Sequence, residues 1–91
     1  MRGPRHKRYL MLTSEIPIGE EARKELIHRI AKISPTMAKK AVWFERAVIV
    51  RTDNVDLPMV KEALEVTAEG VSLKSSLASG SIGKLKKAVP G

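Results

Sequence analysis

The stretch AVWFERAVIVRT, residues 41–52, places two strand-like segments next to each other in the middle of the chain. Residues 41–45 and 47–52 are rich in the aromatic and β-branched residues that strands favour. So little sequence separates them that a tight hairpin is the natural link. Helix-like segments lie before and after this pair, and two adjacent strands between helices are typical of a split βαβ arrangement.

The segments on either side complete the pattern. Residues 8–13 form a short apolar strand followed by turn-forming residues, and residues 20–33 carry apolar side chains every three or four positions, as an amphipathic helix does. After the hairpin, Pro58 suits the first turn of a second helix, which Gly70 ends. Residues 71–77 alternate apolar and polar side chains, which predicts a last strand with one buried face.

The resulting order of strand, helix, strand, strand, helix, strand predicts an α+β, ferredoxin-like (RRM-like) sandwich, βαββαβ. We expect an antiparallel sheet of strand order 4-1-3-2 with two helices on one face, and a first helix that ends at Ser34-Pro35. The expected organisation is a basic N-terminal arm over residues 1–7, the ferredoxin-like domain over 8–78, and a Ser/Gly turn with a basic C-terminal segment over 79–91.

Two helices on one face would leave the other face of the sheet uncovered. The central strands are apolar on both faces, so Tyr9, Met11 and Ile49 would form a contiguous exposed patch. Monomeric proteins seldom expose such a patch unless something docks there. We therefore expect these three residues in a partner interface. The alternative is that the chain ends fold back and cover this face.

The composition limits the class of protein. A chain of 91 residues allows one small domain, and 43% hydrophobic with 30% charged residues is typical of a globular one. Cysteine is absent, and His6 and His28 alone are too few for a closed zinc site. No apolar run approaches the roughly 20 residues that span a bilayer. We expect a cytoplasmic protein without a metal site or a membrane association.

The net charge of +7 comes from the two ends of the chain. Residues 1–14 and 70–91 contain lysine and arginine but no acid, whereas all the acidic residues lie between them. In the expected topology the first strand begins beside the end of the fourth, so both basic ends share one end of the sheet. Such a surface suits a polyanion, because each neutralised phosphate releases counterions. The expected phosphate contacts are Arg5, Lys7, Arg8, Lys39, Lys40, Arg51, Lys84, Lys86 and Lys87.

Residue types that perform catalysis form no recognisable motif. His6 falls in the arm and His28 on the first helix, where an exposed histidine is far commoner than a general base. The segment SGSIGK, residues 79–84, fails the nucleotide-binding loop pattern, because Ala78 and Leu85 stand where Gly and Ser or Thr belong. We expect no catalytic residues in this chain.

Several segments resemble the Pop-five family of ribonuclease P protein subunits. They are Lys7-Arg8-Tyr9-Leu10, Val48-Ile49-Val50-Arg51, Val60-Lys61-Glu62-Ala63-Leu64 and Leu77-Ala78-Ser79-Gly80-Ser81-Ile82 with its basic continuation. The resemblance covers most of residues 7–87 and adds Ser79, Gly80 and Ser81 to the expected RNA contacts. Family members are usually longer, and Gly83 stands where a basic residue would be expected.

The resemblance implies a non-catalytic protein subunit of archaeal-type ribonuclease P. Such a subunit supports the catalytic RNA, which removes the 5′ leader of precursor tRNA, and it pairs with a TIM-barrel protein subunit. The implied partners are therefore ribonuclease P RNA, precursor tRNA and that subunit. No cofactor is expected, because the RNA and not this chain would hold Mg²⁺.

Two other functions fit the same fold. A protein-interaction or small-ligand regulatory module would use the sheet face to form a homodimer, with the basic charge serving only solubility. A small hydrolase of the acylphosphatase type uses an Arg and an Asn, for which Arg51 and Asn54 are the candidates. The glycine-rich loop that such hydrolases place after the first strand is missing from the sequence.

Overall fold

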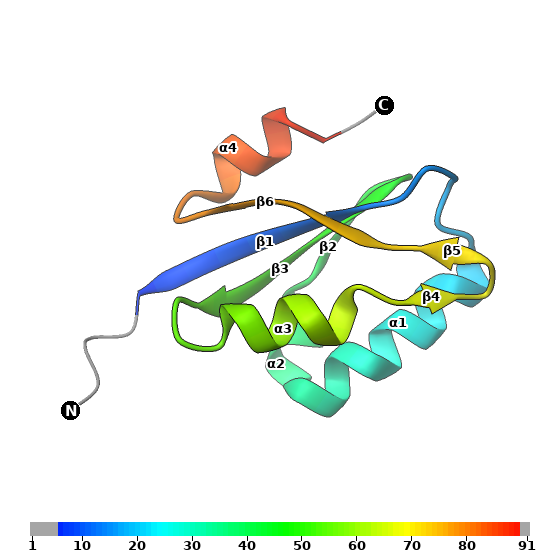
Figure 1. The fold of residues 1–91 in the computed structure, drawn as a ribbon, viewed down its shortest axis with the longest axis horizontal. Coiled ribbons are helices and arrows are strands. Elements are labelled where there is room, and N and C mark those ends of the chain that lie inside the picture. Colours follow the sequence, from blue (N-terminus) through cyan, green and yellow to red (C-terminus); the bar gives the residue numbers. More distant parts are fainter. Residues whose placement is uncertain (1–5, 90–91) are drawn as a thin grey trace.

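A four-stranded antiparallel sheet forms the centre of the fold in the computed structural model, which describes residues 6–89 (Figure 1). Its strands are β1 (Lys7–Thr13), β2 (Val42–Trp43), β3 (Ala47–Asp53) and β6 (Lys74–Ser79), in the order β2-β3-β1-β6. Four helices accompany it within the described residues. The expected α+β class with a four-stranded antiparallel sheet is confirmed, and the arrangement is compatible with a ferredoxin-like fold.

Strand β1 lies in the middle and fixes the register of its neighbours. It pairs with β3 from Lys7↔Asp53 to Thr13↔Ala47. On its other side it pairs with β6, and this register shifts between Met11 and Leu12. Alternate side chains of a strand point to opposite faces, so Leu10 and Leu12 contribute to one core and Met11 to another.

The first core lies between the sheet and the helices α1 (Glu20–Ile33) and α3 (Leu57–Leu64). Apolar residues at helical spacing form the buried stripe of α1, and its acidic first turn and basic last turn suit the helix dipole. This core contains Leu10, Leu12, Ala22, Leu26, Ile30, Val48, Val50, Val60 and Leu64.

A short helix that the sequence analysis did not predict, α2 (Pro35–Lys40), follows α1 directly. Pro35 ends α1 as expected, but it also occupies the first turn of α2, where its missing N–H costs nothing. The Oγ of Ser34 accepts a hydrogen bond from the Met37 N–H at 3.3 Å and so caps the new helix. Met37 is buried in the first core and holds α2 beside β3.

The second expected helix is shorter than the sequence pattern indicated. Helix α3 ends at Leu64, and the chain then forms a small hairpin of β4 (Thr67–Ala68) and β5 (Val71–Ser72). The two residues of its turn, Glu69 and Gly70, have φ of 50° and 78°. Gly70 therefore serves a two-residue hairpin turn and not the end of a helix.

The expectation of an uncovered sheet face is wrong, because helix α4 (Ile82–Lys87) covers it. Figure 1 shows α4 on the opposite side of the sheet from α1, α2 and α3. Leu85 packs there with Met11 and Ile49, and all three are 1% exposed. Met11 and Ile49 are therefore core residues and not an exposed docking patch. The face is covered by a segment near the C-terminal end of the chain, as in the alternative given above.

Among the described residues, 6–89, no helix is long and apolar enough to cross a membrane.

Candidate nucleic-acid interface

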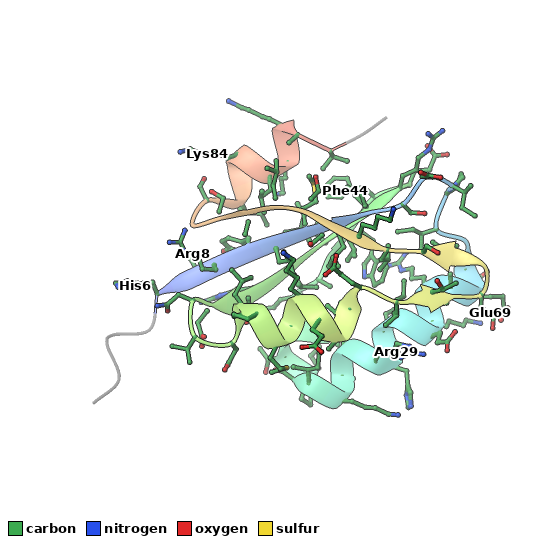
Figure 2. The ribbon with its side chains drawn as sticks, viewed as in Figure 1. His6, Arg8, Arg29, Phe44, Glu69 and Lys84 are labelled. Atoms are coloured by element: carbon green, nitrogen blue, oxygen red, sulfur yellow. The ribbon has the colours of Figure 1, made fainter. Side chains whose placement is uncertain are left out.

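The structure brings the basic start of β1 and the basic C-terminal segment together. Tyr9 pairs with Ser79, so β6 ends where β1 begins. A β-carbon added to Gly80, just beyond β6, would lie 3.9 Å from both a guanidinium nitrogen of Arg8 and the carbonyl oxygen of Lys7. In Figure 2, Arg8 and Lys84 lie at one end of the molecule and Glu69 lies at the other.

Helix α4 presents its lysines to solvent because its apolar residues are turned toward the sheet. Ile82, Leu85 and Val89 pack on the second core, and this spacing leaves the intervening positions outside. Lys84, Lys86 and Lys87 are exposed, as are Lys7 and Arg8. We call Lys7, Arg8, Lys84, Lys86 and Lys87 the basic pole.

Within residues 6–89, the ion pairs are Glu20–Lys24 and Glu25–Arg29, both on α1. None of the basic pole residues has an acidic partner in this part of the chain. Their charges are therefore available to an anionic ligand.

A hydrogen bond between two serines stabilises the turn that joins β6 to α4. The Ser81 N–H donates a hydrogen bond to the Oγ of Ser79 at 3.1 Å. Ser81 stands at the N-cap of α4, yet its hydroxyl caps no backbone N–H of the helix. Gly80 and Ser81 are exposed beside Arg8, whereas Ser79 is half-buried. The backbone at Gly80 and the Ser81 hydroxyl are accordingly the parts of this turn that a ligand can reach.

Tyr9 lies at the border between the basic pole and the second core. It is half-buried and packs against the core beneath α4. The Lys7 ammonium lies 5.5 Å from the centre of its ring, within cation–π range. Tyr9 thus supports the position of Lys7, and part of its surface stays accessible.

The remaining expected contacts fall elsewhere or outside the described residues. Lys40 and Arg51 line one pocket of about 230 Å³ between α2 and β3, together with Ser34, Thr36, Met37 and Thr52. Lys39 is exposed next to them in the last turn of α2. Arg5 lies outside the described residues. Lys39 and Lys40 of α2 and Arg51 of β3 therefore form a second, smaller group of cations.

The side chain of Asp53, near this end, is engaged in the turn after β3. The Asp53 carboxylate accepts hydrogen bonds from the N–H groups of Val55 and Asp56, at 2.9 and 2.7 Å. Asn54 and His6 exchange two hydrogen bonds that extend the β1–β3 ladder. The side-chain amide oxygen of Asn54 thus accepts a hydrogen bond from the His6 N–H.

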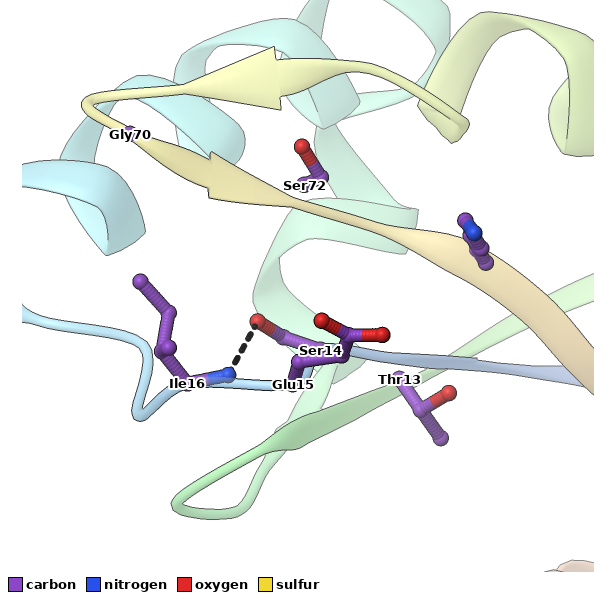
Figure 3. Close-up of a pocket in the computed structure, with 7 residues that line it drawn as sticks. Thr13, Ser14, Glu15, Ile16, Gly70 and Ser72 are labelled. Carbon is purple, nitrogen blue, oxygen red and sulfur yellow. Dashed lines mark hydrogen bonds between the residues drawn. The ribbon is translucent and has the colours of Figure 1, made fainter.

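A larger pocket, of about 530 Å³, opens at the other end of the sheet (Figure 3). It forms beyond the last β1–β6 pair, Thr13↔Lys74, where the loop after β1 separates from β5. Its lining residues are Thr13, Ser14, Glu15, Ile16, Gly70, Ser72 and Lys74. The sequence analysis missed this pocket, because it depends on where two distant segments stop pairing and no linear motif marks it.

The carboxyl group of Glu65 has a perturbed pKa. Glu65, just after α3, accepts hydrogen bonds from the backbone N–H and the hydroxyl of Ser75 on β6, both at 3.1 Å. The backbone bond, followed by the hydroxyl bond, lowers the pKa of the Glu65 carboxyl below its ordinary value. Glu65 thereby ties the edge strand β6 to α3.

No family model matches the chain, and no curated protein matches it. Among residues 6–89, no group of three or more histidine or acidic side chains is placed to hold a metal ion.

Proposed function

We propose that this protein is an RNA-binding, non-catalytic protein subunit of an archaeal-type ribonuclease P, built on a ferredoxin-like fold of strand order 4-1-3-2. The observation that carries the proposal is the proximity of Arg8 to the Gly80 turn, which brings Lys7 and Arg8 to the same end of the sheet as the lysines of α4. Its proposed partners are the ribonuclease P RNA, precursor tRNA and a TIM-barrel protein subunit. In this role the chain positions RNA, and the RNA performs the cleavage.

The basic pole suits the recognition of phosphates more than of bases. Its cations stand on a strand and a helix that the core already holds in place. The elements that carry these side chains therefore need little further ordering when a ligand binds. Only Tyr9 offers an aromatic ring there, and Lys7 already lies over that ring. Serial base stacking needs several such rings. We therefore propose that the Gly80 turn and the surrounding cations follow an RNA backbone.

The triple variant K84A/K86A/K87A tests the proposal, with ribonuclease P RNA as the probe and binding measured at several salt concentrations. Removing one phosphate contact should reduce the slope of log K against log salt by about 0.7 to 0.9. The slope for the triple variant should therefore fall by about two units, and its affinity should fall as well.

The matched control is the triple variant K24A/K61A/K74A, which removes the same charge from exposed lysines of α1, α3 and the far end of β6. It should keep most of the affinity and the slope. Equal reductions in the two triple variants would show that net charge alone, and not the basic pole, attracts the RNA.

A small-ligand regulatory module is the second candidate, and the pocket at the far end favours it. Its volume of about 530 Å³ falls within the range of about 300 to 1,000 Å³ typical of ligand sites. Glu15 and Lys74 offer one charge of each sign beside three hydroxyl groups, which suits a small zwitterion. A rise in melting temperature with one of the standard amino acids, absent in Glu15→Gln, would support this function over RNA binding.

A further inference from the structure

The pocket between α2 and β3 combines charges and hydroxyls that the basic pole does not include. It is lined by Ser34, Thr36, Met37, Lys40, Arg51 and Thr52. We propose that it binds one phosphate–ribose unit of an RNA strand, as a second contact separate from the basic pole. This inference rests on the proposed function and names the part of the RNA that this site recognises.

The lining residues match a sugar phosphate in their chemistry. Lys40 and Arg51 are exposed cations among the lining residues, and none of the six lining residues is acidic. A guanidinium binds phosphate through parallel hydrogen bonds, and an ammonium binds it as a point charge. Ser34, Thr36 and Thr52 add hydroxyl groups, which both donate and accept hydrogen bonds. A phosphate with an attached ribose uses both kinds of group.

The fold leaves this pocket open for a definite reason. Strand β2 pairs with β3 at Val42↔Ile49 and Trp43↔Val48. The continuation of β3 through Arg51 and Thr52 therefore runs past the end of β2, and α2 lies beside it. Because β2 is too short to pair with this part of β3, the pocket lies there.

Both walls of the pocket are fixed by the protein core. Met37 is 7% exposed and packs into the first core, and the Ser34 cap fixes the start of α2. The other wall belongs to a central strand whose preceding residue, Val50, is fully buried. The pocket thus exists before a ligand arrives, which lowers the ordering cost of binding.

The size of the pocket argues against a larger organic ligand, and its lining argues against a nucleobase. The volume of about 230 Å³ lies below the range of about 300 to 1,000 Å³ for larger organic ligands. No aromatic ring lines the pocket, so a base would find no stacking partner. The hydroxyl groups suit the ribose 2′-OH, which is the group that distinguishes RNA from DNA.

The position of the pocket gives the RNA a path around the sheet. Helix α2 belongs to the layer of α1 and α3, and α4 lies on the opposite face (Figure 1). Tyr9 of β1 pairs with Arg51 on one side and with Ser79 on the other. A strand of RNA bound at both places would therefore cross the end of the sheet from one layer to the other.

The test is a titration of the isotope-labelled protein, followed by amide NMR shifts, with ribose 5-phosphate, inorganic phosphate and ribose as probes. We expect saturable shifts at Thr36, Met37 and Thr52 with ribose 5-phosphate, weaker binding of inorganic phosphate, and none of ribose. The variant K40A/R51A should weaken ribose 5-phosphate binding about tenfold or more, because it removes charge-assisted hydrogen bonds. The double variant K24A/K61A, which removes the same charge from exposed lysines of α1 and α3 outside the pocket, should leave it unchanged.

Thr52→Val provides a second variant that preserves volume and charge. It should weaken ribose 5-phosphate more than inorganic phosphate, because it removes a hydroxyl proposed to contact the sugar. Shifts that spread over all exposed lysines without saturation, or equal effects of K24A/K61A and K40A/R51A, would overturn the proposed site.

Binding of ribonuclease P RNA separates this inference from the proposed function. If K84A/K86A/K87A weakens RNA binding and K40A/R51A does not, the pocket is not an RNA site and the proposed function stands. If neither variant changes RNA binding although ribose 5-phosphate saturates the pocket, the site serves a free sugar phosphate and the RNA assignment fails. Loss of RNA affinity in both variants, with a smaller effect of K40A/R51A on a DNA strand, supports the inference.

Discussion

Gly80 lies against Arg8: a β-carbon on Gly80 would be 3.9 Å from a terminal guanidinium nitrogen of that arginine. Ser79 pairs with Tyr9 in the sheet, so strand pairing places the Gly80 turn beside the start of β1, where the carbonyl oxygen of Lys7 is equally close. The turn leads directly into α4 and its lysines. The cations near both ends of the chain are thus held in one place by strand pairing.

Gly80→Asp should weaken RNA binding by placing a carboxylate beside Arg8. The carboxylate would compete with phosphate for the guanidinium, so we expect a salt slope less steep by about 0.7 to 0.9, as when one phosphate contact is removed. Gly80→Ala is the matched control. Its β-carbon meets only ordinary contacts, and the φ of Gly80 is not positive, so the backbone accepts alanine. Equal affinities of the two variants, measured by salt titration, would place Arg8 outside the RNA interface.

Leu85→Ala should release α4 from the sheet, because Leu85 is 1% exposed and contacts the core formed by Met11 and Ile49. Truncating a buried leucine costs about 2 to 5 kcal/mol. We expect faster hydrogen exchange in α4, binding of a hydrophobic dye to the exposed face, and weaker RNA binding, because the lysines lose their support. Leu77→Ala removes the same atoms at a position that is 48% exposed and should change stability by less than about 0.5 kcal/mol. Similar unfolding curves for the two variants would contradict the burial of Leu85.

The strands β1 and β3 and the helix α1 could be predicted because each carries its own periodic apolar pattern. Because β1 and β3 are apolar on both faces, we expected either a partner or a chain end to cover the second face, and the structure buries both faces within the chain. What covers the second face could not be settled in the same way. The apolar residues Ile82, Leu85 and Val89 have helical spacing, but lysines surround them and the segment is only six residues long as a helix. Its pattern therefore indicates a basic segment more strongly than a helix.

The other differences arise where one residue serves two kinds of element. Ser34-Pro35 both ends α1 and begins α2, since a proline that cannot continue a helix is well suited to start one. Gly70 suits the end of a helix and the second position of a hairpin turn equally, and only the pairing of Ala68 with Val71 decides between them. The pocket between α2 and β3 depends on both the extra helix and the short β2. The sequence therefore identified Lys40 and Arg51 as candidate phosphate contacts, but it could not show that they line the same pocket.

Glu69→Asn should stabilise the protein. Glu69 has φ of 50° in the two-residue turn between β4 and β5, a left-handed conformation that costs an ordinary residue roughly 1 to 2 kcal/mol. Asn-Gly is a preferred pair for such a turn. We expect a gain of about 1 kcal/mol, which raises the melting temperature of a domain of this size by about 4 to 8 °C. Glu69→Gln removes the same charge without the preference for this conformation, so a comparable gain from Gln would mean that charge and not backbone strain is responsible.

Glu65→Gln should reduce stability in a pH-dependent way. The hydrogen bonds from Ser75 lower the pKa of the Glu65 carboxyl in the folded state, so folding favours its ionised form. The stabilisation is therefore fully present above the unfolded-state pKa of about 4.3 and is lost as the pH falls through the lower folded-state value. Urea unfolding of wild type and Glu65→Gln should differ most near neutral pH and converge in acid. Glu62→Gln, which removes an exposed carboxylate one turn earlier on α3, should show no such convergence, and a difference for Glu65→Gln that stays constant with pH would contradict the ionised hydrogen bonds to Ser75.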